Sequence, residues 1–224
     1  MSGIFFGDDS LRMPSNIDSQ GKFYLILPNG VTSIRSAASP AHIDCLKSIK
    51  IPDTLESIQD TSFGLAGIEN LYIPDSVTSI GNSAFIYCTE LKYVRLPKYL
   101  TSLPASVFDG CTSLESVSLP LNLEEIGYHT VERGQGKTFN ECSSLTKMVF
   151  PKTLTTIYGS CFTGCTSLSE IFFTGDPPTI SDTAFSGLTL TIYYDSANTK
   201  WTTAIRTSTY GGAASVTWKA LSSL

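Results

Sequence analysis

The stretch from Pro74 to Pro97, PDSVTSIGNSAFIYCTELKYVRLP, recurs along most of this chain. Within it, apolar residues are separated by Ser, Thr, Gly and charged residues, which suit turns and solvated edges. The recurrence is easiest to follow on the prolines that close successive units: Pro28, Pro52, Pro74, Pro97, Pro120, Pro151 and Pro177. Their spacings of 24, 22, 23, 23, 31 and 26 residues give a period near 23. Such a period predicts a solenoid in which each unit forms one coil.

A short alternating segment precedes each proline and is predicted to be a β-strand. In YVRLP, which ends at Pro97, successive residues alternate between apolar and polar types with the two-residue period of a pleated strand. Stacked copies would form a parallel sheet. The rest of the unit is too short for a long helix. We therefore expect a second short extended piece over Val77–Ile80 and a helical or 3₁₀ turn around Ala84–Cys88.

Two further positions of the unit recur in type. A phenylalanine stands eleven residues after four of the prolines, and two more take that role at altered spacing: Phe63, Phe85, Phe108 and Phe162, with Phe139 and Phe185. A cysteine precedes a leucine by three residues in four units: Cys88, Cys111, Cys142 and Cys165. Residues of one type at one position of a solenoid are expected to stack, one per coil.

The unit combines a strand ending in Leu-Pro, a Val-Thr-Ser-Ile-Gly-like step and a Phe-x-x-Cys-x-x-Leu step, and so resembles the BspA-like branch of the leucine-rich repeats. The resemblance runs from about Phe23 to Phe185. Departures are local: no Phe follows Pro28, and Ala66 replaces the cysteine of the second unit. The resemblance implies a right-handed leucine-rich-repeat-like solenoid with a parallel β-sheet face, short 3₁₀ or helical turns and terminal caps.

We expect one elongated domain, because the repeat crosses the middle of the chain without a linker. It divides into an N-terminal cap over residues 1–22, an array of about seven coils over 23–194 and a C-terminal cap over 195–224. An insertion is expected near 127–137, since Phe139 lies nineteen residues after Pro120 where eleven is usual. This insertion must bulge from the array, because the repeat resumes after it.

Composition disfavours several partners. The 224 residues are 42% hydrophobic and 16% charged, which is typical of a globular protein. The formal net charge of −5 offers no basic footprint for nucleic acid or an anionic membrane. The sequence contains no run of eighteen apolar residues, so we expect no direct membrane insertion. The opening MSGIFFGDDSLRMPS lacks the charged and apolar regions of a signal peptide, although a leader removed earlier stays compatible with it.

The stacked cysteines do not predict a zinc site. Zinc needs four sulfurs about 2.3 Å from one metal, whereas four rungs about 4.8 Å apart spread over more than about 14 Å. Neighbouring rungs lie within disulfide range, but parallel side chains seldom meet the required torsion. We therefore expect reduced, buried thiols at these positions and at Cys161, while the exposure of Cys45 stays open.

Catalytic, cofactor-binding and metal-ligating patterns are not found in the sequence. Histidine occurs only at His42 and His129, and neither lies beside a nucleophile motif. His129 shares the inserted segment with Glu132 and Arg133, for which a solvated loop is the favoured interpretation. The GQGK tetrapeptide has neither the length nor the setting of a phosphate-binding loop, and nothing suggests paired catalytic carboxylates. We expect no cofactor and no enzymatic activity.

The strand exteriors offer the candidate ligand site. Two residues of each strand point outward, and these stack into a face. Its larger side chains are Lys50, Tyr72, Tyr93 and Arg95 in the first half and Val149 and Phe172 at the far end. Tyr and Arg are residue types enriched at interfaces and in binding hot spots. The simpler interpretation is that strand exteriors favour aromatic and β-branched residues in any case.

The resemblance to BspA-like proteins implies a cell-surface or secreted adhesion module that binds a host protein or a glycan. A structural spacer within a larger surface protein is the alternative. A hydrolase with a site beside residues 127–137 is a third possibility. Four unpaired cysteines fit a reducing compartment equally well, so the location stays open at this point.

Overall fold

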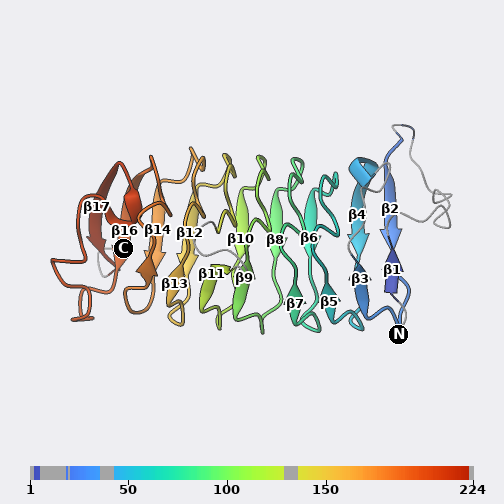
Figure 1. Ribbon diagram of the computed structural model, residues 1–224, viewed down its shortest axis with the longest axis horizontal. Coiled ribbons are helices and arrows are strands. Elements are labelled where there is room, and N and C mark those ends of the chain that lie inside the picture. The colour runs from blue at the N-terminus through green and yellow to red at the C-terminus, as the bar shows by residue number, and fades with distance from the viewer. Residues whose placement is uncertain (1–2, 6–18, 20, 36–42, 129–135, 222–224) are drawn as a thin grey trace.

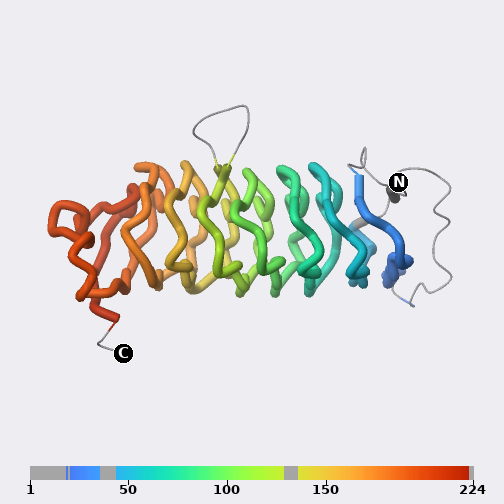
Figure 2. The backbone as a smooth tube through the Cα atoms, turned by 90° about the horizontal axis from the view of Figure 1, so that it is seen from below, coloured from blue at the N-terminus to red at the C-terminus, as the bar shows by residue number. Residues whose placement is uncertain are grey.

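The chain winds into about eight coils of roughly 23 residues, stacked side by side along one axis (Figures 1 and 2). The computed structural model describes residues 3–5, 19, 21–35, 43–128 and 136–221. Within these ranges helical structure is confined to short 3₁₀ turns, among them Ile43–Cys45 and Tyr210–Gly212, and every paired strand runs parallel to its neighbour. The predicted parallel-strand, leucine-rich-repeat-like solenoid is confirmed.

The strands form two rows in Figure 1. The upper row holds β2 (Phe23–Ile26), β4 (Leu46–Lys50), β6 (Asn70–Tyr72), β8 (Tyr93–Arg95), β10 (Ser116–Ser118), β12 (Lys147–Phe150), β14 (Glu170–Phe173), β16 (Thr189–Tyr194) and β17 (Ser215–Ala220). The lower row holds β1 (Gly3–Phe5), β3 (Ser33–Arg35), β5 (Ser57–Ile58), β7 (Ser79–Ile80), β9 (Ser102–Pro104), β11 (Glu125–Tyr128), β13 (Thr156–Ile157) and β15 (Thr179–Ile180). The extended piece predicted over Val77–Ile80 is confirmed by β7.

We call the surface made by the outward side chains of the upper row the long face. Its strands are bonded in three ladders: β2-β4, β6-β8-β10 and β12-β14-β16-β17. The expected parallel sheet is thus divided into separately bonded parts between β4 and β6 and between β10 and β12, although the strands on either side of each division lie in contact. Strand β12 closes the longer coil that includes residues 127–137.

A phenylalanine ladder runs through the core. Successive ring centroids lie 5.3 to 5.7 Å apart, within the range of favourable aromatic pairs, and all six side chains are fully buried: Phe63, Phe85, Phe108, Phe139, Phe162 and Phe185. Each ring packs against the rings of adjacent coils. The coils therefore contribute to one continuous hydrophobic core, and no coil has a separate core of its own.

The segment around each of these phenylalanines is a hydrogen-bonded turn. The turn expected around Ala84–Cys88 is therefore present, but it does not continue into a helix. Ser83 and Tyr87 have φ angles of 54° and 55°, in the left-handed region that interrupts a helix. The N–H of Phe85 between them donates to the carbonyl of Val107 in the next coil, at 3.0 Å. Backbone bonds between coils thus alternate with local turn bonds, such as those from Ile86 to Ser83 and from Cys88 to Phe85.

The four repeated cysteines are buried, as expected. Each thiol donates to the carbonyl of a phenylalanine one coil earlier, as Cys88 does to Phe63 at 3.1 Å and Cys165 does to Phe139 at 3.0 Å. Burial raises the pKa of Cys165 to about 12 and that of Cys161 to about 11. Cys45 is half-buried, and all six cysteines are free thiols.

Described residues from both expected caps continue the strand rows. Strand β1 pairs with β3, and β17 pairs with β16 over its whole length. At the C-terminal end, Trp201 packs on Phe173 with ring centroids 5.2 Å apart, and Tyr210 and Trp218 pack on Trp201. These rings close the end of the core.

Candidate binding face

The central ladder of the long face places its outward residues in two rows. Strand β6 pairs with β8, and β8 pairs with β10, so that corresponding residues lie side by side. The rows are Asn70, Tyr93 and Ser116 in the first, and Tyr72, Arg95 and Ser118 in the second. The apolar residues between them point into the core. The pleat alone therefore presents these side chains to solvent.

Arg95 is held by three neighbours. Its Nη2 lies 2.9 Å from Asp75 Oδ1, its Nη1 donates to the carbonyl of Ile73 at 3.1 Å, and its guanidinium lies 4.6 Å from the centre of the Tyr72 ring. The hydrogen bond from Arg95, with a second from the backbone N–H of Lys98, lowers the pKa of Asp75 to about 2. Tyr72 is 59% exposed, so this cluster presents a ring steadied by a stacked cation.

Tyr93 is also tied in place. Its hydroxyl donates to Glu115 Oε2 at 2.7 Å, and this bond raises the pKa of Tyr93. The ring is 49% exposed. Two neighbouring strands thus each carry one exposed tyrosine with a defined side-chain contact.

The remaining predicted residues lie on the other two ladders. Lys50 is exposed at the end of β4. Val149 on β12 is 53% exposed and pairs in register with Phe172 on β14. Phe172 is half-buried, because its ring stacks on that of Tyr193 with centroids 4.4 Å apart. The six predicted residues therefore do not form one cluster: Tyr72, Tyr93 and Arg95 come together, and Val149 and Phe172 form a separate pair.

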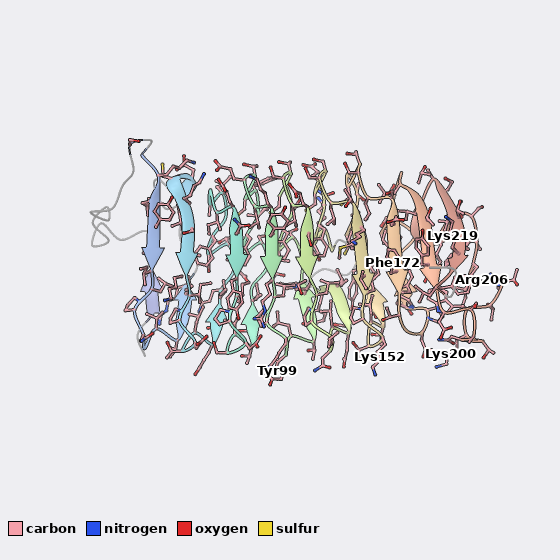
Figure 3. The ribbon with its side chains drawn as sticks, turned by 180° about the vertical axis from the view of Figure 1, so that it is seen from behind. Tyr99, Lys152, Phe172, Lys200, Arg206 and Lys219 are labelled. Carbon is pink, nitrogen blue, oxygen red and sulfur yellow. The ribbon has the colours of Figure 1, made fainter. Side chains whose placement is uncertain are left out.

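Lysine 219 continues the row that holds Phe172. It pairs with Tyr193, and its Nζ lies 5.7 Å from the centre of the Tyr193 ring. Figure 3 labels Phe172 and Lys219 toward the same end of the solenoid. At this end of the long face, Phe172 and Tyr193 are thus packed on each other, whereas Val149 and Lys219 stay exposed.

Sequence reasoning missed two residues of the long face. Tyr24 and Ile26 on β2 are 47% and 71% exposed, and they pair in register with Ser48 and Lys50. The same alternation that located the outward residues of later strands is present in the segment FYLILP. Applying it to that first strand would have found them.

Other candidate chemistry is sparse. His42, His129, Glu132 and Arg133 lie outside the described residues. Among the residues that are described, no group of three or more His, Cys, Asp or Glu is placed to hold a metal ion. No helix in the same part of the chain is long and apolar enough to cross a membrane.

An open groove crosses the turns that enter the lower row. It is lined by polar and acidic residues: Gly30, Thr32, Asp53, Thr54, Glu56, Ser76 and Thr78. None of its lining residues has a large apolar or aromatic side chain of the kind that typically lines small-molecule sites. The exposed tyrosines of the central ladder are the better candidate for ligand contact.

Comparison with known proteins gives a family and a fold. A family model described as "BspA type Leucine rich repeat region" matches in six copies, over residues 20–135 and 132–209. No curated protein matches the chain.

Two solved structures have a similar fold. One is a leucine-rich repeat protein from T. pallidum, with a TM-score of 0.54 and 21% identity over 77% of this chain and 73% of that one. The other is a leucine-rich repeat protein from Bacteroides ovatus, with a TM-score of 0.52 and 22% identity over 88% of this chain and 60% of that one. The chain thus spans less than two thirds of the Bacteroides protein, and both likenesses concern the fold.

Proposed function

The chain belongs to the BspA-type leucine-rich repeat family, and from that premise we propose that it is a non-enzymatic recognition module that binds its ligand on the long face. The ligand is a protein of a host matrix or cell surface, or a glycan. The module is part of a cell-surface or secreted protein, as the resemblance to BspA-like proteins implies. Extended repeat arrays suit this work because they offer a long rigid surface.

One observation carries the proposal: exposed aromatic residues of the long face are held in place before any ligand arrives. Tyr72 stacks under the Arg95 guanidinium, and Tyr93 is bonded to Glu115. A side chain that is already ordered loses less conformational entropy on binding. Tyr and Arg are also the residue types that most often dominate interface energetics.

The absence of catalysis is part of the proposal. The family consists of repeat proteins that are generally non-enzymatic. In the central ladder of the long face, the outward charged group of Arg95 is engaged in an ion pair with Asp75. Such groups suit the positioning of neighbours better than proton transfer to a substrate.

A structural spacer is the alternative, and the packing of Phe172 on Tyr193 favours it for the C-terminal part of the long face. An aromatic ring that is covered by another ring of the same protein has less exposed surface for contact with a ligand. If the domain is a structural spacer, no part of the long face should bind a ligand.

The test is a binding screen of the purified domain against immobilised extracellular matrix proteins and glycans. The variant Y72A/Y93A/R95A removes the central cluster, and Tyr99→Ala is the matched control, because Tyr99 is 61% exposed but lies at the turn edge (Figure 3). We expect saturable binding by the parent and by the Tyr99 variant, and loss of binding by the folded triple variant. Absence of any ligand for the parent would leave the spacer. Undiminished binding by the triple variant would show that Tyr72, Tyr93 and Arg95 do not form the site.

A further inference from the structure

The central ladder combines two exposed rings with short polar side chains. Tyr72 and Tyr93 are 59% and 49% exposed, and the three outward residues beside them are also exposed. We call this set the tyrosine platform: Asn70, Tyr72, Tyr93, Ser116 and Ser118. All five side chains come from three strands in direct register.

The two rings are set diagonally on neighbouring strands. Tyr93 pairs with Asn70, whereas Tyr72 lies two residues further along β6. With strands about 4.8 Å apart and a rise of about 3.3 Å per residue, the two Cα atoms are roughly 8 Å apart. A ligand that contacts both rings must therefore extend beyond a single small ring.

The side chains of the platform match the two faces of a sugar. The C–H groups of a pyranose pack on the face of an aromatic ring, and its hydroxyls both donate and accept hydrogen bonds. Asn70, Ser116 and Ser118 can likewise donate and accept. Tyr72 and Tyr93 supply large apolar surfaces with few rotatable bonds.

The charged groups that contact the platform tyrosines, together with the ion-pair partners of those groups, carry no net charge. Asp75 pairs with Arg95 at 2.9 Å and with Lys98 at 3.4 Å, while Glu115 accepts from Tyr93. Arg95 and Lys98 thus supply two positive charges, and Asp75 and Glu115 supply two negative ones. Complementarity then favours a ligand without net charge.

The surroundings are unlike the centre of a protein interface. Interface hot spots lie in well-packed, desolvated pockets. Here polar residues separate the rings, and the exposed aliphatic residues Ile26 and Val149 lie on other ladders. We infer that the platform binds an uncharged oligosaccharide, with Tyr72 and Tyr93 as stacking surfaces. This inference rests on the proposed function and specifies the ligand class of the same face.

The experiment is isothermal titration of the full chain with cellohexaose, xylohexaose, mannohexaose and chitohexaose. We expect at least one of them to bind, and binding to weaken about tenfold or more in Tyr72→Ala and in Tyr93→Ala. Tyr72→Phe should stay within about threefold of the parent, because it keeps the ring. Asn70→Ala should weaken binding, and Tyr99→Ala should not. Raising the salt concentration should change the affinity little, since the ligand is uncharged.

Three outcomes would overturn the inference, and they separate it from the proposed function. Binding of a deglycosylated matrix protein through Tyr72 and Tyr93, with none of the four sugars bound, would overturn the ligand class and leave the recognition module standing. Sugar binding that survives both alanine variants would place the sugar elsewhere. If neither sugars nor proteins bind, the inference and the proposed function both fail.

Discussion

Arg95 is the residue on which the candidate site depends most. Its planar guanidinium bonds Asp75 and the carbonyl of Ile73 while its face stacks on Tyr72. A lysine has no planar group to make these contacts together. Arg95 is therefore better described as a support for the Tyr72 ring than as a free charge awaiting an anionic ligand.

The Asp75 carboxyl provides a pH-dependent test of this cluster. Its pKa falls from an ordinary value of 3.8 to about 2 in the folded protein, chiefly through the bond from Arg95. A carboxyl with a lower pKa in the folded state contributes stability above its unfolded pKa and loses that contribution as the pH falls through the folded value. Asp75→Asn should therefore be less stable than the parent at pH 6, and the difference should shrink between about pH 4 and pH 2.

Urea unfolding of both proteins across that pH range measures the effect. Asp53→Asn is the matched control, because Asp53 occupies the same position one unit earlier. A stability difference between parent and Asp75→Asn that stays constant from pH 6 to pH 2 would contradict the ion pair.

At the scale of the element, each coil is held in place by hydrogen bonds to the neighbouring coils. The N–H of Phe85 donates to Val107 of the next coil, and the thiol of Cys88 donates to Phe63 of the previous coil. The left-handed residues that flank Phe85 orient these groups outward along the solenoid axis. A turn of this kind is stable only where a neighbouring coil supplies the partners.

The cysteine positions of the coil predict low thiol reactivity. Burial raises the pKa of Cys111 and Cys142 well above its ordinary value, so little thiolate exists at neutral pH. Titration of the native protein with a thiol reagent at pH 7.5 should label at most one or two cysteines, with Cys45 the first. Unfolding in guanidinium should expose all six. Labelling of four or more in the native protein would contradict the buried ladder.

At the scale of the whole molecule, the coils share one core and differ at the surface. The phenylalanine ladder continues from Phe63 to Phe185 and crosses the division between β10 and β12 of the long face. The outward residues change from exposed rings at Tyr72 and Tyr93 to the self-packed pair of Phe172 and Tyr193. Stability is thus distributed along the array, whereas the proposed site is local.

This distribution predicts the effect of removing a unit. Deletion of residues 75–97 joins Pro74 to Lys98 and keeps the repeat in phase. The shortened chain should fold, with a lower urea midpoint and a smaller m-value, because fewer coils are left to share interfaces. Deletion of residues 75–85 alone breaks the phase and should prevent folding. Circular dichroism during urea titration distinguishes the two outcomes, and equal stability of both variants would contradict the model of stacked units.

The sequence alone was sufficient to identify the solenoid, its strands and most of its buried residues. Its period, the alternation before each proline, and the recurring Phe and Cys positions all describe one coil, and parallel stacking then places like residues together. The outward positions of Tyr72, Tyr93 and Arg95 followed from the same alternation. The boundaries of the caps and the binding role of the long face stay predictions.

How neighbouring coils contact one another could be learned only from the three-dimensional fold. The turn around Phe85 is not helical because its N–H finds an acceptor in Val107, and no local pattern reveals a bond between residues so far apart in the chain. For the same reason the sequence did not reveal that Asp75 holds Arg95 or that Tyr193 covers Phe172. These contacts depend on side-chain directions across coils, whereas a repeat pattern specifies only the position of each residue within its own coil.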